Sequence, residues 1–555
     1  MTHPPLRISL RTLPMALALA FPLTSHGQAE APALRNAPQA AEAASAPRAA
    51  AKPVVRFTIT SVRFTPTKAV PESELQQVVR PWLNREIVAT DLAVVAVALR
   101  RHYEERGYGL VGVGFPTQDL AQGVLQIAIV EPRIVRVTVE SPDKPPISPQ
   151  KITAVLERNG VAKDEPLDVL ALDRAMYTLN DWPGVGARST LLPTGDEGRY
   201  AIAVQTEARR GWDASVDADN YGSETTGRYR AGALLRWNNP TGSGDNLDLR
   251  ASVSSGKGTL VGRLGYEVPL GASAWRLGAG ISRVEYELGQ DFAGAGAVGS
   301  ADVADLSLSY PFVRTRDRNL VGRIALTNKK LVDEFGSTTE KKVRGGEFGL
   351  SFENRDAFAG GGFTGGNVSL QFGKLDIETD DYRNYDATLG DRATQGSFRK
   401  LGVQVNRLQA IVPRVSLFVG VVGQLASKNL DNAEKMTLGG ARGVRAYPSA
   451  EGSSDEAAVL NTELRLWVDP QWTGFLFYDA GHGKRFKRPD ETPATPTTPV
   501  PSNTLNLHGW GLGVQYTNPE LFTLKAAVAR RGDEPVTSEA DNKRTRFLVE
   551  LQHAF

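Results

Sequence analysis

The chain has 555 residues, enough for several domains, and its 64 basic and 62 acidic residues leave a formal net charge of +2. A chain so close to neutral is not expected to bind nucleic acid through bulk electrostatics. It contains no cysteine, which excludes disulfides, thiolate metal sites and a thiol nucleophile. Its 55 glycines and 41% hydrophobic content favour many short, alternating strands over one large buried core.

Residues 1–29 have the composition of a secretory signal peptide. Arg7 and Arg11 supply a basic region, and a short apolar stretch follows. Gly27-Gln28-Ala29 then places small residues where a signal peptidase cleaves, so the mature chain is expected to begin near Glu30. A short membrane anchor is the alternative, but the apolar stretch is shorter than a membrane-spanning helix requires.

Residues 30–53 are rich in alanine and proline and show no apolar periodicity. This composition predicts a flexible tether. Beyond the N-terminal region the sequence contains no apolar run of about 18 residues, so no membrane-spanning helix is expected. A closed barrel of strands would then be the remaining way for the chain to cross a bilayer.

Two modules of nearly equal length follow, over residues 54–131 and 132–208. Both predict the order strand, helix, helix, strand, strand, which indicates duplication of one supersecondary unit. In the first module Thr90 is the expected N-cap of the second helix. The expected strands lie at 55–64, 111–115, 123–130, 134–139, 185–192 and 200–206, and the expected helices at 72–83, 90–106, 150–158 and 167–179. A generic pair of α+β domains is the alternative.

From residue 209 to residue 555 the pattern changes to a period of two. Trp212 and Val216 alternate with Asp213 and Asp217, for example. This alternation is typical of a water-filled barrel with an apolar outer face and a polar lumen, although a soluble sandwich also alternates. Tight connections alternate with long polar ones, as the two sides of a membrane would require. The tight ones are expected at 239–242, 310–312 and 469–470. The pattern predicts about 16 antiparallel strands.

The strand order predicts which connections lie outside. If the first strand runs outward, the polar loop at 427–458 and the Pro- and Thr-rich loop at 484–506 are both external. The chain ends in a strand, 546–555, whose last residue is Phe555. This ending resembles the sorting signal of outer-membrane barrels; an ordinary edge strand is the alternative.

Two short motifs are candidates for a functional site in the barrel. The first is Gly443-Val444-Arg445-Ala446-Tyr447 in the 427–458 loop, and the second is Phe477-Tyr478-Asp479-Ala480-Gly481 on a strand. On that strand Phe477, Asp479 and Gly481 share one face, which in a barrel would be the lumen. Asp479 would need a cation there, and Arg445 is the obvious candidate. Gly481 leaves room for a loop backbone. An incidental surface arginine and an unrelated aspartate are the alternative.

Together the motifs resemble the paired Val-Arg-Gly-Tyr (or Phe) and Phe-x-Asp-x-Gly signatures of POTRA-barrel transporters of bacterial outer membranes. The chain departs from the first signature at Ala446, where the family usually has glycine. Only glycine adopts positive φ at little cost, so the backbone geometry of the loop tip is in question here. Turn sequences at 107–108, 116–118 and 179–184 resemble those of tandem POTRA domains. In some members of the family the segment equivalent to 30–53 is a plug helix, which is the alternative to a tether here.

The resemblance implies α+β periplasmic POTRA modules followed by an all-β transmembrane barrel. Two such modules before a barrel of this size resemble a two-partner secretion transporter of the hemolysin secretion/activation type. By resemblance, the modules would capture the N-terminal secretion domain of a large, unfolded exoprotein, and the barrel would export it. Contacts with outer-membrane lipid and, during biogenesis, with the barrel-assembly machinery are also implied. A barrel-assembly factor of the same superfamily is the alternative, and a passive porin would not need the modules.

Signals for catalysis are weak. The histidines lack metal-ligand spacing, and no lysine follows the glycines at 360–362 and 365–366 at the spacing of a phosphate-binding loop. No Gly-x-Ser-x-Gly elbow is present. The sequence therefore predicts a protein that is not an enzyme, with no metal site, no cofactor and no nucleic-acid partner.

Overall fold

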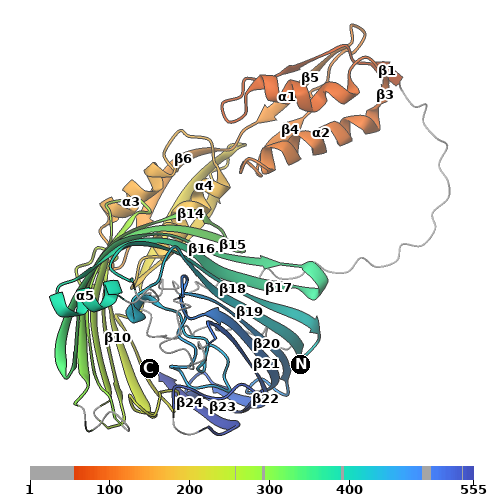
Figure 1. Ribbon diagram of the computed structural model, residues 1–555. Coiled ribbons are helices and arrows are strands. Elements are labelled where there is room, and N and C mark those ends of the chain that lie inside the picture. Colours follow the sequence, from red (N-terminus) through yellow and green to blue (C-terminus); the bar gives the residue numbers. More distant parts are fainter. Residues whose placement is uncertain are drawn as a thin grey trace. The chain divides into compact units, whose positions relative to one another are not determined.

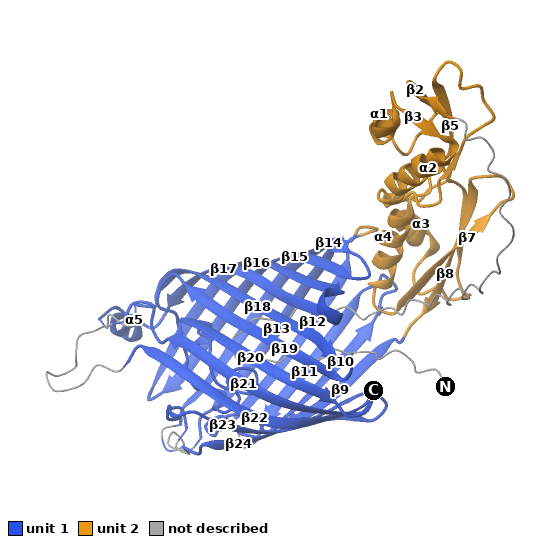
Figure 2. Cartoon of the chain, turned by 90° about the vertical axis from the view of Figure 1, so that its right-hand side faces the viewer, with its two compact units in different colours: residues 1–24, 210–270, 274–555 blue, residues 25–209, 271–273 orange. Residues whose placement is uncertain are grey.

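The computed structural model describes residues 56–256, 258–289, 294, 296–388, 393–489, 502–539 and 542–555. The expected signal peptide and the segment 30–53 lie outside these residues. The described chain forms two compact units, one ending at residue 209 together with 271–273, the other comprising 210–270 and 274–555 (Figure 2). None of the helices in the described ranges is long and apolar enough to span a membrane.

The first module contains a three-stranded sheet covered by two helices. Its elements are β1 (Arg56–Thr58), β2 (Ser61–Phe64), α1 (Glu72–Val79), η1 (Arg80–Trp82), β3 (Glu86–Val88), α2 (Ala89–Glu104), β4 (Gly112–Gly114) and β5 (Val124–Val130). The sheet order is β2-β5-β4, and β1 pairs separately with β3. Apolar residues of α1 and α2 pack on the sheet, among them the buried Leu75 and Leu99.

Three expectations for this module were wrong in detail. The strand expected at 55–64 is two strands, because β1 pairs with β3 while β2 pairs with β5. The helix expected at 72–83 changes to a 3₁₀ turn after Val79, since Pro81 has no amide to continue the α-helical ladder. Thr90 is not an N-cap: α2 already begins at Ala89, and the Asp91 carboxylate accepts the Val88 amide at 2.9 Å.

The second module repeats the order strand, helix, helix, strand, strand. Its elements are β6 (Arg133–Glu140), α3 (Pro149–Arg158), α4 (Val169–Asn180), β7 (Val185–Pro193) and β8 (Arg199–Ala208), with the sheet order β6-β8-β7. Both helices have side-chain caps: Ser148 accepts the Lys151 amide, and Asp168 accepts the Ala171 amide. The helices bury their apolar faces on the sheet around Trp182.

A buried carboxylate, that of Glu131, stabilises the first module next to its junction with the second. It accepts the backbone amides of Lys68 at 2.6 Å and Ala69 at 3.0 Å, and the Tyr103 hydroxyl at 2.9 Å. Burial, together with this carboxylate, raises the pKa of the Tyr103 phenol well above its ordinary value. The phenol therefore remains a hydrogen-bond donor at any physiological pH.

The second unit is a closed antiparallel barrel of sixteen strands within the described residues, β9 to β24, which confirms the expected fold and strand number (Figure 1). The strands are β9 (Trp212–Asp219), β10 (Arg230–Asn238), β11 (Asn246–Ser254), β12 (Thr259–Pro269), β13 (Arg276–Glu287), β14 (Val298–Arg314), β15 (Arg318–Phe335), β16 (Ser337–Asp356), β17 (Gly362–Ile377), β18 (Gly396–Val412), β19 (Val415–Ala426), β20 (Glu456–Trp467), β21 (Trp472–Lys484), β22 (Thr504–Asn518), β23 (Phe522–Arg531) and β24 (Thr545–Ala554). A short helix, α5 (Asp380–Thr388), lies between β17 and β18.

The barrel has an apolar outer face. Trp212, Val216 and Leu249 are exposed on it, as the period of two predicts, and Trp212 stacks on Trp237 with 4.9 Å between ring centroids. The barrel closes where β24 pairs with β9, so the final strand is not an edge strand. The Phe555 amide donates to the Ala214 carbonyl at 2.9 Å.

One expected turn was wrong. The segment 310–312 lies inside β14, where the pairing with β15 shifts register between Pro311 and Val313. Proline cannot donate to a strand ladder, so it occupies a bulge, and the tight turn follows at 315–317 instead.

Connections that follow odd-numbered strands lie at the end of the barrel opposite to the start of β9. The connection 427–455, after β19, is at that end, as are the end of β21 and the start of β22, which flank the connection 485–503. Residues 490–501 lie outside the described residues. The bounds of both connections are slightly shorter than the expected 427–458 and 484–506, because the flanking strands continue further into the polar segments.

The Glu131 network leads to a stability prediction. Glu131→Ala leaves several buried donors without an acceptor, so it should lower the free energy of unfolding of a 54–208 fragment by about 3 kcal/mol. Tyr103→Phe removes one donor and keeps the acceptor, and should cost about 1 kcal/mol. Urea denaturation followed by circular dichroism measures both.

Glu197→Ala, in an exposed turn, is the matched control and should change stability by less than about 0.5 kcal/mol. Equal stability of the Glu131 and Glu197 variants would show that the network contributes nothing.

Candidate functional site

The long connection 427–455 carries the first motif and lies packed against the inner wall of the barrel. Val444, Ala446 and Tyr447 are fully buried, and Arg445 is 5% exposed. The loop is compact because its backbone bonds to itself: the Val444 amide donates to the Leu438 carbonyl at 2.8 Å, and the Gly440 amide to the Tyr447 carbonyl at 3.0 Å. Its tip therefore presents Arg445 in a fixed position.

The second motif lies on β21 with the alternation that its sequence indicates. Leu476 and Tyr478 are exposed on the outer face, 57% and 46% respectively. Phe477 is buried, and Asp479 is entirely inaccessible. The wall thus offers a carboxylate and an aromatic ring to whatever fills the lumen.

Arg445 binds Asp479 through two parallel hydrogen bonds. Its Nε donates to Oδ2 at 2.8 Å and its Nη2 to Oδ1 at 2.7 Å, and its backbone amide also donates to Oδ2 at 3.1 Å. The guanidinium carbon lies 3.7 Å from the centroid of the Phe477 ring. Asn461 on β20 bridges the two motifs, since its Nδ2 donates to Asp479 Oδ1 and to the Gly443 carbonyl, both at 2.8 Å. A planar guanidinium fits this forked geometry, whereas a lysine ammonium would not.

A second carboxylate, which the motifs did not predict, also binds the guanidinium. Glu463 on β20 accepts from Arg445 Nη1 and is itself paired with Arg465 at 2.6 Å. The signal for it was available in the sequence: Asn461, Glu463 and Arg465 alternate along one strand and so share its inner face. That pattern shows which side chains face the lumen but not which loop residue they bind.

Two glycines on the wall make room for the loop. A Cβ placed on Gly481 would lie 3.0 Å from Val444 Cγ2, and one on Gly509 would lie 2.6 Å from the Ala446 Cβ. The Ala446 backbone is not among the positive-φ positions of the described chain, so alanine is not strained there. Its methyl group fills the space that Gly509 leaves open.

The first part of the loop is bound to another section of the wall, β15 to β18, by a separate set of buried ion pairs. Glu434 binds Lys329 on β15 at 2.6 Å and Lys400 on β18 at 2.7 Å, and Asp431 binds Lys341 on β16 at 2.9 Å. These residues were not predicted as site residues. Their partners are far apart in the sequence, and no local pattern links them.

The last part of the loop contacts the neighbouring connection, 532–544. Glu451 accepts the amides of Thr537 at 2.8 Å and Ser538 at 2.9 Å, and the Tyr447 hydroxyl donates to the Glu534 carbonyl at 3.1 Å. The loop is therefore bound at three places by ion pairs or hydrogen bonds. At its tip, Leu438, Val444 and Tyr447 also pack in a buried apolar cluster with the barrel wall.

Comparisons with known proteins agree with this architecture. The family model described as haemolysin secretion/activation protein ShlB/FhaC/HecB matches residues 198–516, and that of the ShlB-type POTRA domain matches residues 57–132. The heme/hemopexin transporter protein HuxB of Haemophilus influenzae strain 86-028NP is 24% identical over 88% of this chain and 86% of its own length. The outer membrane transporter CdiB of Dickeya dadantii is 24% identical over 79% and 78%.

Among solved structures, CdiB from Escherichia coli superposes with a TM-score of 0.71 at 20% identity, over 90% of this chain and 91% of its own. That likeness concerns the fold. The family match extends over more than half of the chain and favours secretion over the barrel-assembly alternative. The chain therefore belongs to the haemolysin secretion/activation family ShlB/FhaC/HecB and is an outer-membrane transporter of two-partner secretion, with POTRA modules in the periplasm.

Proposed function

We propose that the two periplasmic modules capture an unfolded exoprotein by strand addition, and that the loop at 427–455 leaves its position in the lumen as the client passes. The observation that carries the proposal is the loop itself. It fills part of the lumen and is held by ion pairs and hydrogen bonds together with one apolar cluster at its tip. The client is expected to be large and to be recognised through its N-terminal secretion domain.

Free sheet edges support the capture step. In the described residues β6 and β7 each pair with a single strand in the second module, and they are eight and nine residues long. The segment 164–167 bonds to the start of β6, and Asn180 bonds to Ala187 on β7, so the remainder of each edge is open. The edges of the first module, β2 and β4, are only four and three residues long. An extended client can add to an unpaired edge through backbone hydrogen bonds. The second module therefore offers the longer surface for capture.

The ion pairs support the transit step. The loop must move out of the way before a client can pass through the lumen. This movement requires Arg445 to separate from Asp479 and Glu463. Removing one partner of a buried pair typically costs about 3–5 kcal/mol, because the other charge is left unpaired. New contacts must offset this cost in the displaced state, and an extended polypeptide can supply them through its own polar groups.

Capture is tested with a fragment of residues 54–208 and the secretion domain of the cognate exoprotein. Leu192→Lys puts a charge on the β7 edge, where lysine opposes strand addition, and should weaken binding about tenfold, or 1.4 kcal/mol. The readout is isothermal titration calorimetry.

Leu170→Lys on α4 is the matched control, because Leu170 is 47% exposed and Leu192 is 45% exposed, in the same module. Equal weakening by both variants would argue against capture of the client at the β7 edge. Binding of the client by the barrel alone would overturn the assignment of capture to the modules.

The lumen pair is tested with a double-mutant cycle in the full chain. Arg445→Ala and Asp479→Ala should each reduce secretion of the partner, and the double variant should lose less than the sum of the two. Arg445→Ala should be the more damaging, since it leaves two carboxylates without their shared cation, while Asp479→Ala leaves Arg445 bound to Glu463. Arg445→Lys should rescue poorly because it lacks the planar fork.

Heat-modifiability in gel electrophoresis is the control for barrel assembly. Strictly additive losses would mean that the pair does not act as a unit in transport. If the Arg445→Ala variant has a folded barrel and secretes the partner at the wild-type level, the position of the loop has no role in transport.

A further inference from the structure

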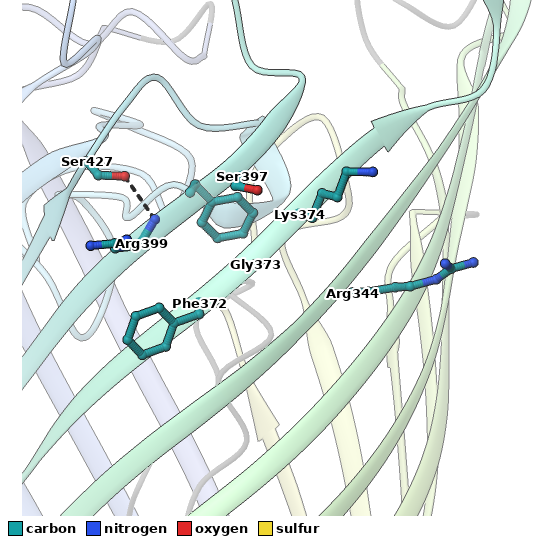
Figure 3. A pocket seen from close by; sticks show the side chains of 8 residues that line it. Arg344, Phe372, Gly373, Lys374, Ser397, Arg399 and Ser427 are labelled. Carbon is teal, nitrogen blue, oxygen red and sulfur yellow. Dashed lines mark hydrogen bonds between the residues drawn. The ribbon is translucent and has the colours of Figure 1, made fainter.

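An open pocket of about 590 Å³ on the barrel wall combines three cations with aromatic side chains. It extends over β16, β17 and β18 (Figure 3). Its lining consists of Arg344, Phe372, Gly373, Lys374, Ser397, Phe398, Arg399 and Ser427. None of these residues belongs to the lumen site described above.

The strand alternation places the three cations on the outer face of the barrel. Arg344 has the parity of Phe348 on β16, which is 55% exposed. Lys374 has the parity of the exposed Phe372 on β17, and Arg399 that of Leu401 on β18. The cations therefore project toward the membrane side of the wall and not into the lumen.

Each cation also stands at the external border of the apolar residues on its own strand: Arg344 precedes Phe348 on β16, Lys374 follows Phe372 on β17, and Arg399 precedes Leu401 on β18. On β17 the outward residues Val368, Leu370 and Phe372 are followed, toward the external end, by Lys374. The register places Arg344 and Lys374 opposite each other, and Phe372 opposite Arg399. Apolar side chains thus lie on one side of this row, and the external end of the barrel lies on the other. This is the depth at which lipid headgroups meet a barrel.

Two of the three cations have no acidic partner in the part of the chain that the structure describes. Neither Arg344 nor Arg399 forms an ion pair there, whereas Lys374 binds Asp376 at 2.8 Å. Arg344 and Lys374 extend to one side of Gly373, and Arg399 and Phe372 to the other (Figure 3). An unpaired arginine beside hydrocarbon favours a phosphate, which it can bind through two parallel hydrogen bonds.

We propose that this pocket binds a lipid whose headgroup carries two phosphates, with its acyl chains on the apolar face below. One phosphate contacts Arg344 and Lys374, and the other contacts Arg399. The ring of Phe372 packs between them, at 5.9 Å from the Arg399 guanidinium carbon. The site would fix the depth of the barrel in the outer leaflet through a specific headgroup, in addition to the general attraction of an apolar surface for lipid.

The test uses the full chain purified in a neutral detergent and native mass spectrometry of bound lipid. The wild type should bind one molecule of bisphosphorylated lipid A, at least about tenfold more tightly than monophosphorylated lipid A or phosphatidylcholine. Arg344→Gln combined with Arg399→Gln should remove that preference. Inorganic phosphate at millimolar concentration should not displace the lipid.

A matched control removes two outward cations that already have carboxylate partners: Arg283→Gln, paired with Asp302, and Lys330→Gln, paired with Glu340. Its lipid binding should remain within about twofold of the wild type, and heat-modifiability shows that each barrel is folded. An equal loss in control and test variants would overturn the site. If the test variant does not fold, the wild-type preferences still decide: no selectivity for two phosphates, or displacement by free phosphate, would refute a lipid site.

Discussion

Burying a guanidinium removes its hydration, a cost that directly bound carboxylates can offset, and the loop tip in this barrel depends on one such arrangement. Arg445 reaches two acids on adjacent strands and lies against the Phe477 ring. Taking these charges out of water is costly, so the loop tip is stable in this position only while the charges remain paired. The position of the loop tip, the burial of Tyr447 and the orientation of Asp479 all follow from that requirement. The same requirement makes the arrangement sensitive to the loss of any one charge.

Much of the fold was predictable because it is encoded by neighbouring residues. The alternation of apolar and polar residues after residue 209 predicted the barrel, and the strand order predicted that the loop at 427–458 is external. The match of two short motifs brought Arg445 and Asp479 together as candidates. Local detail was predicted less well. The turn expected at 310–312 was wrong, because the bulge at Pro311 lets a strand continue through a sequence that resembles a turn.

The remainder of the site could not be read from local pattern. The pairing of Glu434 with Lys329 and Lys400 depends on the register accumulated over several hairpins and on the path of a long loop. No periodicity in the sequence indicates that register or the path of the loop. Glu463 was visible as an inward residue of β20, yet its role as a second partner of Arg445 required the geometry of the loop tip. A strand pattern therefore indicates which charges face the lumen, whereas only the folded chain shows which of them meet.

The close approach of Ala446 to Gly509 has a consequence for how such barrels diversify. The two positions occupy a single small volume, one contributing a methyl group and the other only a hydrogen. A larger residue at either position would push the loop tip away from β22 and separate the charges beside it. Position 509 is also confined by the Arg530 carbonyl oxygen, 3.1 Å from where a Cβ would lie, so a glycine at 446 would not by itself make room for a side chain at 509. Variation is therefore confined to the loop side of this contact: position 446 can hold glycine or alanine, whereas position 509 requires glycine.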